Sequence, residues 1–154
     1  MGSWKAIFLV LAFAFSFASP AAAITWQGLT PARSNYDDAV KAFGKPYQQH
    51  RVDNQVDMFS FKTKNSGDGK AHVFVQRKDK RILAIAFAPP QYLSREDIHK
   101  AFKEPDEVIR DEEGRLIEFY GDPGLMINYD DDDKSVKLLL TLPTGTAGKK
   151  KTPV

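Results

Sequence analysis

The chain has 154 residues, a formal net charge of +2 and no cysteine. A charge so close to zero argues against a nucleic-acid binder, which needs a concentrated basic surface, and the lack of cysteine excludes disulfides and a thiol nucleophile. The length suits one ordinary domain, whose stability must come from burial.

The first 23 residues have the composition of a secretory signal peptide. A single lysine, Lys5, precedes an apolar run at residues 6–18 that is too short to span a bilayer comfortably. Pro20 and three alanines then form a cleavage site before Ile24. We therefore expect a periplasmic or secreted protein of 131 residues. No cysteine is present for lipidation, so we expect no membrane anchor after cleavage.

One short sequence occurs twice. DAVKAFGKPY begins at Asp38 and DIHKAFKEPD begins at Asp97; both contain Lys-Ala-Phe, and both have a proline eight residues after the aspartate. Apolar residues recur at helical spacing around each copy, and Asn35 and Ser94 stand where an N-cap is needed. Each copy predicts an amphipathic helix of about three turns.

After each helix the hydrophobic period changes from about 3.6 to 2. Alternating segments predict three strands in each half, at residues 56–63, 70–78 and 81–88, and at residues 115–120, 125–129 and 135–142. The halves differ in length by five residues, chiefly in the hairpin tip at residues 64–70. We predict an α+β fold in which two tandem helix-plus-three-strand repeats form one antiparallel sheet with both helices on one face.

These elements divide the chain into six segments. They are a signal peptide at 1–23, a lead-in at 24–34, repeat unit 1 at 35–89, a linker at 90–93, repeat unit 2 at 94–143 and a disordered tail at 144–154. The tail has no apolar period and contains a lysine cluster. Trp26, in the lead-in, is expected to lie across the sheet or against the edge of a helix.

The repeated pattern carries a family resemblance. A short capped helix ending in FGKP or FKEP, and then DEEGRLIEFYGDPGLMINYDDDDKSVKLLLTLP, resembles the repeat of β-lactamase-inhibitor-like domains and of the related outer-membrane assembly lipoproteins of the SmpA/OmlA type. The resemblance covers residues 35–143 and implies the fold above and a protein-binding role. It transfers no catalytic residue, because these families are not enzymes. The chain departs from the lipoproteins in lacking the lipidated cysteine, and Lys103 replaces the glycine found at Gly44.

No pattern in the sequence is typical of catalysis, so we expect a protein that is not an enzyme and has no cofactor. A nucleophile elbow and a phosphate-binding loop are both missing. His50, His72 and His99 fall in different predicted elements, without the spacing of metal ligands.

A run of four carboxylates between two apolar segments is the one candidate for a cation site. It comprises Asp130, Asp131, Asp132 and Asp133. Four carboxylates can hold a hard cation such as calcium, but the glycine and glutamate of an EF-hand loop are missing. We interpret the run as a solvated hairpin tip, with calcium binding as the weaker alternative.

Strand alternation assigns a candidate binding surface to the side of the sheet away from the helices. We expect two pairs of residues to face the helices, Val73 and Val75 in one strand and Ile117 and Phe119 in another. Because side chains alternate along a strand, their neighbours then face outward. The predicted partner-binding residues are His72, Phe74, Gln76, Glu118 and Tyr120. Such a mixture of aromatic, amide and charged groups suits protein recognition. Alternatively, the two aromatic residues are covered by Trp26 and the tail, or are ordinary surface aromatics.

The sequence therefore predicts an exported, non-catalytic protein-interaction module, either inhibitor-like or an accessory of envelope assembly. The predicted partner is a protein rather than nucleic acid. The alternative is a periplasmic protein that binds calcium or a small ligand at the acidic turn or between the two halves.

Overall fold

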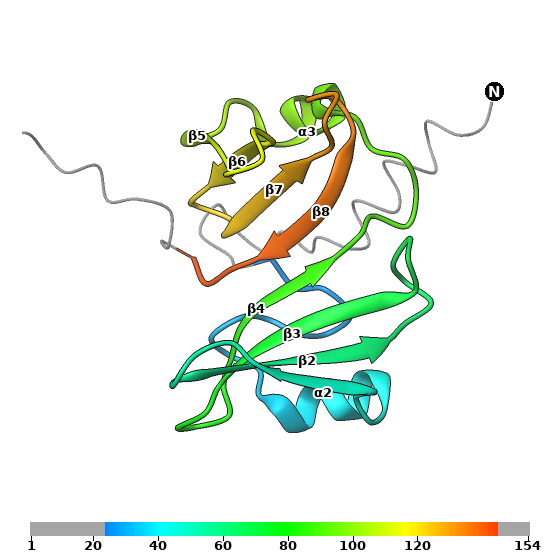
Figure 1. Ribbon diagram of the computed structural model, residues 1–154, viewed down its shortest axis with the longest axis vertical. Coiled ribbons are helices and arrows are strands. Elements are labelled where there is room, and N and C mark those ends of the chain that lie inside the picture. The colour runs from blue at the N-terminus through cyan, green and yellow to red at the C-terminus, as the bar shows by residue number, and fades with distance from the viewer. Residues whose placement is uncertain (1–23, 145–154) are drawn as a thin grey trace, which may run out of the picture.

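The computed structural model describes residues 24–144; the predicted signal peptide and nearly all of the predicted tail lie outside this range. The described residues form an α+β fold with two helices and one eight-stranded antiparallel sheet (Figure 1). None of the helices in this range is long and apolar enough to cross a membrane.

The chain order is a helix followed by four strands, and then another helix followed by four strands. The first half contains α2 (Tyr36–Phe43), β1 (Gln48–Arg51), β2 (Val56–Lys62), β3 (Lys70–Gln76) and β4 (Ile82–Phe87). The second half contains α3 (Arg95–Phe102), β5 (Glu107–Arg110), β6 (Leu116–Tyr120), β7 (Leu125–Tyr129) and β8 (Val136–Thr141).

Both helices begin with the predicted cap. The Asn35 side chain accepts a hydrogen bond from the backbone N–H of Asp38 at 3.0 Å, and the Asp38 carboxylate accepts one from the Asn35 N–H at 2.9 Å. Ser94 and Asp97 form the same reciprocal pair at the start of α3, at 3.1 and 3.0 Å. These capping boxes satisfy backbone donors that a helix leaves unpaired, and they fix where each helix begins.

The six predicted strands are confirmed, but the prediction of three strands in each half is wrong. Each half has a fourth strand, β1 or β5, which follows the helix and lies at the outer edge of the sheet. All four residues of each edge strand are exposed. A strand exposed on both faces has no alternation of apolar and polar residues, so the sequence pattern did not reveal it.

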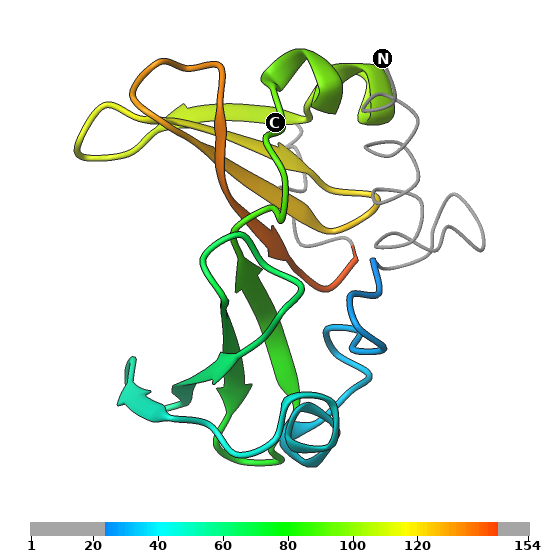
Figure 2. The ribbon, with the colours of Figure 1, turned by 90° about the vertical axis from the view of Figure 1, so that its right-hand side faces the viewer.

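The strand order in the sheet is β1-β2-β3-β4-β8-β7-β6-β5, and the halves join where β4 pairs with β8. Ile85 lies opposite Thr141, and Phe87 lies opposite Leu139. Figure 2 shows a strong twist, with the strands of the two halves running at a steep angle to each other. Continuing the register from strand to strand places the residues packed under α2 and those packed under α3 on the same face, which we call the helix face.

The lead-in packs against the helix face and contacts both halves. The Trp26 ring stacks on Phe87 with 4.0 Å between centroids, and it lies 5.6 Å from the ring of Phe43 on α2. The backbone N–H of Ile24 donates to the carbonyl of Pro123 in the second half at 3.3 Å. Ile24, Trp26 and the strands thus share one continuous core. The expected position of Trp26 is confirmed.

Candidate functional site

The candidate site is the face of the sheet opposite the helices, which we call the helix-free face. Register assigns to it sixteen residues of the six central strands: Val56, Met58, Ser60, Lys62, Lys70, His72, Phe74, Gln76, Ala84, Ala86, Ile117, Phe119, Met126, Asn128, Leu138 and Leu140. Most of them are half-buried, whereas Val73 and Val75 on the helix face are at most 1% exposed. The predicted orientation of His72, Phe74 and Gln76 is therefore confirmed.

The predicted orientation of Glu118 and Tyr120 is wrong. Glu118 is 0% exposed and Tyr120 is 3% exposed, and both lie on the helix face beneath α3. Ile117 and Phe119, which we expected to face inward, are half-buried on the helix-free face. A charged residue in a strand usually faces solvent, and that rule assigned β6 the wrong phase.

The helix-free face is apolar along most of its width. Met58 lies directly opposite Phe74 in the first half, and Met126 lies between Phe119 and Leu140 in the second. Ala86, opposite Leu140, connects these groups across the junction of β4 and β8. Methionine and aromatic side chains pack adaptably and supply large contact areas, which suits this band to a protein surface.

Few polar groups interrupt this band. The Ser60 hydroxyl lies 2.8 Å from Nδ1 of His72, so these two groups satisfy each other. The side-chain oxygen of Asn128 is buried and has no hydrogen-bond partner within the described residues. Register places no carboxylate on this face in the six central strands, and its two lysines, Lys62 and Lys70, lie at the hairpin end of β2 and β3.

Glu118 belongs instead to a buried polar cluster under α3. Its carboxylate accepts hydrogen bonds from Arg95 Nε at 2.7 Å, His99 Nε2 at 2.9 Å, the Tyr129 hydroxyl at 2.7 Å and the Tyr120 hydroxyl at 3.2 Å. These donors occupy both carboxylate oxygens, so the cluster binds α3 to the sheet. Sequence reasoning missed it, although Arg95 and His99 stand one helical turn apart and could have indicated a buried acceptor below them.

The charges of this cluster set the pKa values of its members. Burial by itself would raise the pKa of Glu118, but the hydrogen bonds from Tyr129, His99 and Arg95 outweigh it, so the pKa is lowered. Burial, together with the Glu118 carboxylate, raises the pKa of Tyr129 and of Tyr120. At neutral pH the cluster therefore holds an ionised carboxylate and neutral phenols, and these phenols donate to it.

The acidic run forms a tight turn between β7 and β8. Asp132 accepts from the backbone N–H groups of Lys134 and Ser135, both at 2.8 Å, and from the Ser135 hydroxyl at 2.6 Å. These hydrogen bonds, led by the one from the Ser135 hydroxyl, lower its pKa to about 2. Asp133 pairs with Arg110 of β5 at 2.7 Å. Within residues 24–144 no group of three or more histidine, aspartate or glutamate side chains could hold a metal ion.

The three histidines lie in separate elements: His50 in β1, His72 in β3 and His99 in α3. His72 pairs with Ser60, and His99 contacts Glu118, so two of the rings serve local hydrogen bonds.

Comparison with known proteins adds a fold neighbour. No protein-family model matches the chain, and no curated protein sequence matches it. A crystal structure of a DUF4309 family protein, YjgB from Bacillus subtilis, superimposes with a TM-score of 0.53 at 19% sequence identity. The alignment covers 76% of this chain and 84% of that one. This likeness concerns the fold alone.

Proposed function

We propose that this chain is an exported, non-catalytic module that binds a partner protein through the helix-free face. One observation carries the proposal. A half-buried band that includes Met58, Phe74, Phe119 and Met126 crosses both halves of the sheet, and no helix within residues 24–144 covers it. Contiguous apolar surface of this kind marks interaction sites on soluble proteins.

The residues of the proposed interface differ from those chosen by pattern alone. His72, Phe74 and Gln76 remain, and Ile117 and Phe119 replace the buried pair in β6. Aromatic side chains at the centre of an interface supply much of its binding free energy, so Phe74 and Phe119 are the proposed anchors.

We further infer that the two halves are tandem copies of one helix-plus-four-strand unit. Equivalent backbone hydrogen bonds support this inference. The first residue of each helix donates to the turn before the last strand, from Tyr36 to Lys80 at 2.8 Å and from Arg95 to Lys134 at 2.7 Å. The resemblance to inhibitor-like and SmpA/OmlA-type repeats agrees with duplication, and it favours an inhibitor or an accessory of envelope assembly as the function.

The test is a double variant, Phe74→Ala with Phe119→Ala, used as bait against an envelope extract of the organism that makes the protein. We expect the captured partner to bind at least about tenfold more weakly, because each aromatic anchor contributes on the order of 2 kcal/mol. The variant should stay folded, as shown by circular dichroism and thermal melting.

Tyr92→Ala provides the matched control, because Tyr92 is 67% exposed and lies in the linker between the halves, outside the strands that form the helix-free face. The control should capture the partner as the wild type does. Equal capture by the double variant and the wild type would contradict the proposed interface.

A further inference from the structure

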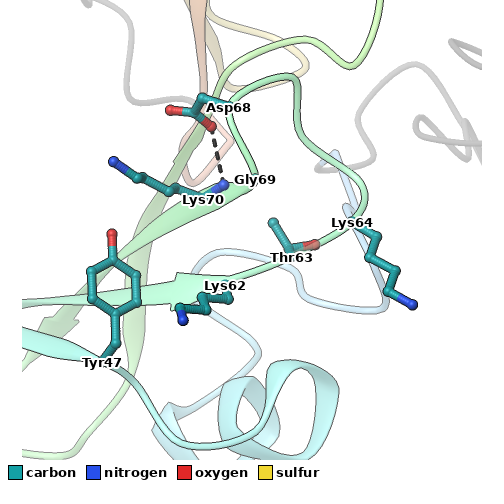
Figure 3. A pocket seen from close by; sticks show the side chains of 7 residues that line it. All are labelled: Tyr47, Lys62, Thr63, Lys64, Asp68, Gly69 and Lys70. Carbon is teal, nitrogen blue, oxygen red and sulfur yellow. Dashed lines mark hydrogen bonds between the residues drawn. The ribbon is translucent and has the colours of Figure 1, made fainter.

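A second surface feature lies at the tip of the β2–β3 hairpin. A pocket of about 490 Å³ is lined there by Lys62, Lys64 and Lys70, together with Tyr47, Thr63 and Asp68. In Figure 3 the side chains of Lys62 and Lys70 approach the Tyr47 ring from two strands, while Lys64 points away from them. The pocket thus combines an aromatic side chain with two lysines from neighbouring strands.

Two lysines of this pocket lie side by side on neighbouring strands. Lys62 and Lys70 are direct cross-strand partners, and like charges placed opposite each other destabilise a sheet. Within residues 24–144 neither of them, nor Lys64, lies within 4.0 Å of a carboxylate. An anion bound between the lysines would remove the repulsion.

The one carboxylate in the pocket is used by the hairpin itself. Oδ1 of Asp68 accepts from the Ser66 hydroxyl at 3.2 Å and from the backbone N–H of Lys70 at 3.1 Å. Asp68 therefore shapes the turn, and it leaves the two opposed ammonium groups without a carboxylate partner at ion-pair distance.

Several contacts fix the hairpin tip. The Thr63 N–H donates to the Gly69 carbonyl at 2.9 Å, and the Gly67 N–H donates to the Ala88 carbonyl at 3.1 Å. The Asn65 side chain donates to the Gln27 side chain of the lead-in at 2.8 Å. A tip held at three points presents its lysines on a fixed frame, and preorganisation of this kind lowers the entropic cost of binding.

The pocket occurs only where the two halves differ in length. Residues 62–70 separate the cross-strand pair Phe61 and Ala71, whereas only residues 121–124 separate the corresponding pair Tyr120 and Leu125. The shorter loop, GDPG, contains no lysine. Loops vary freely between copies of a unit and are frequent carriers of function.

The geometry points to a binding site for a phosphate-bearing anion in this pocket, with Lys62 and Lys70 as the charged ligands and Tyr47 as the aromatic side chain. Ammonium groups bind phosphate as point charges, and charge-assisted hydrogen bonds of this kind are roughly twice as strong as neutral ones. The anion is either a free phosphate compound or the headgroup of a lipid. The site lies at the hairpin end of the helix-free face, apart from the proposed anchors.

The experiment titrates the full exported chain with inorganic pyrophosphate at 150 mM salt and follows backbone amides by NMR. In a second arm the protein is sedimented with vesicles of phosphatidylglycerol or of phosphatidylcholine alone. We expect saturable shifts at Tyr47 and residues 62–70, and binding at least about tenfold weaker in the double variant Lys62→Gln with Lys70→Gln. If the protein sediments with phosphatidylglycerol vesicles but not with phosphatidylcholine vesicles, and the double variant does not sediment with either, the anion is the headgroup of a lipid.

The control is Lys41→Gln with Lys78→Gln, which removes the same charge from exposed positions on α2 and in the β3–β4 turn. The control also retains the lysines at 149–151, so any non-specific attraction by them is equal in the two variants. Equal weakening of both variants, shifts spread over the whole surface, or no binding of either probe would overturn the site. None of these outcomes depends on a partner protein, so they are separate from the test of the helix-free face.

Discussion

The two halves of the sheet place their helices in the same way but fill the space beneath them with different chemistry. Under α2, the Tyr36 ring lies 4.6 Å from Phe59, and Phe43 lies 5.5 Å from Phe61. Under α3, the residue at the same place as Tyr36 is Arg95, which forms an ion pair with Glu118 at 2.7 Å. The aromatic contact near the helix end is kept in both halves.

This difference shows that the arrangement of helix and strands in each half does not depend on one kind of side-chain chemistry beneath the helix. Shared features of the backbone hold both helices: the capping boxes, the hydrogen bond from the first helical residue to the turn before the last strand, and the antiparallel register. The chemistry beneath the helix then decides how each half responds to mutation and to pH. The four predictions that follow test this contrast, from the largest expected effect to the smallest.

Removing the buried carboxylate should have the largest effect. Glu118→Ala leaves the Tyr129 and Tyr120 hydroxyls and the Arg95 charge without their acceptor, so we expect a loss of about 3–5 kcal/mol in the free energy of unfolding, measured by urea denaturation. Glu113→Ala, at an exposed partner of Arg115, should cost less than about 1 kcal/mol. A Glu118→Ala variant as stable as the control would contradict the role of the cluster.

Acid should weaken the second half before the first. The pKa of Glu118 is lower in the folded protein than in the unfolded chain, so its contribution is complete above the unfolded pKa and is lost as the pH falls through the folded pKa. Asp111, Asp132 and Asp133, whose pKa values are also lowered, lie in the second half too.

Hydrogen exchange at pH 7 and at a pH near 3 should show that protection of β6 and β7 is lost before that of β2 and β3. In Glu118→Gln this difference between the halves should shrink. Simultaneous loss in both halves of the wild type would mean that the contrast in chemistry has no effect on local stability.

Two glycines, one in each half, lie in the hairpin loop that approaches the segment after the last strand of that half. A side chain at Gly67 would overlap the carbonyl oxygen of Pro89, and one at Gly124 would overlap that of Leu142. Gly67→Ala should therefore cost about 1–3 kcal/mol. Gly124→Ala should cost more, because Gly124 also has a φ of +69°, which disfavours a side chain. Thermal melting of both variants measures these losses of stability. A larger loss in Gly67→Ala than in Gly124→Ala would contradict the comparison.

The C-caps give the smallest and most specific effect. Gly44 has a φ of 84° and Lys103 a φ of 63°, so both residues end a helix in a conformation that glycine adopts without strain. Lys103→Gly should raise the free energy of unfolding by up to about 1 kcal/mol, and Gly44→Ala should lower it by about 1 kcal/mol. A loss of stability in Lys103→Gly would show that its side chain has a stabilising contact that outweighs the strain.

Much of the fold could be predicted because its signals are local. Asn35 and Ser94 identify the helix starts, since a cap needs only residues within one turn. The buried strands β2 and β3 alternate in hydrophobicity and β4 is a short apolar run, so all three were found with nearly correct bounds. The edge strands β1 and β5 bury neither face, and therefore contain no such signal.

The error in the candidate site has a tertiary cause. In β6 both alternating sets contain large apolar residues, so the position of Glu118 decided the phase, and a glutamate normally lies in water. It is buried here because Arg95 and His99 on α3 donate to it, and that pairing depends on how α3 crosses the sheet. In β3 no such conflict exists, since the polar residues His72 and Gln76 fall in the set opposite to that of Val73 and Val75.

The central claim is that the helix-free face binds a partner protein, and site-specific photocrosslinking tests it most directly. A photoreactive phenylalanine analogue would replace Phe74 or Phe119 in turn, and also Ala42, which is exposed on α2 on the other side of the sheet. On illumination in the envelope extract, positions 74 and 119 should give the same crosslinked partner, and position 42 should give none. Crosslinking of that partner from position 42 alone would place the interface on the helix side and contradict the account.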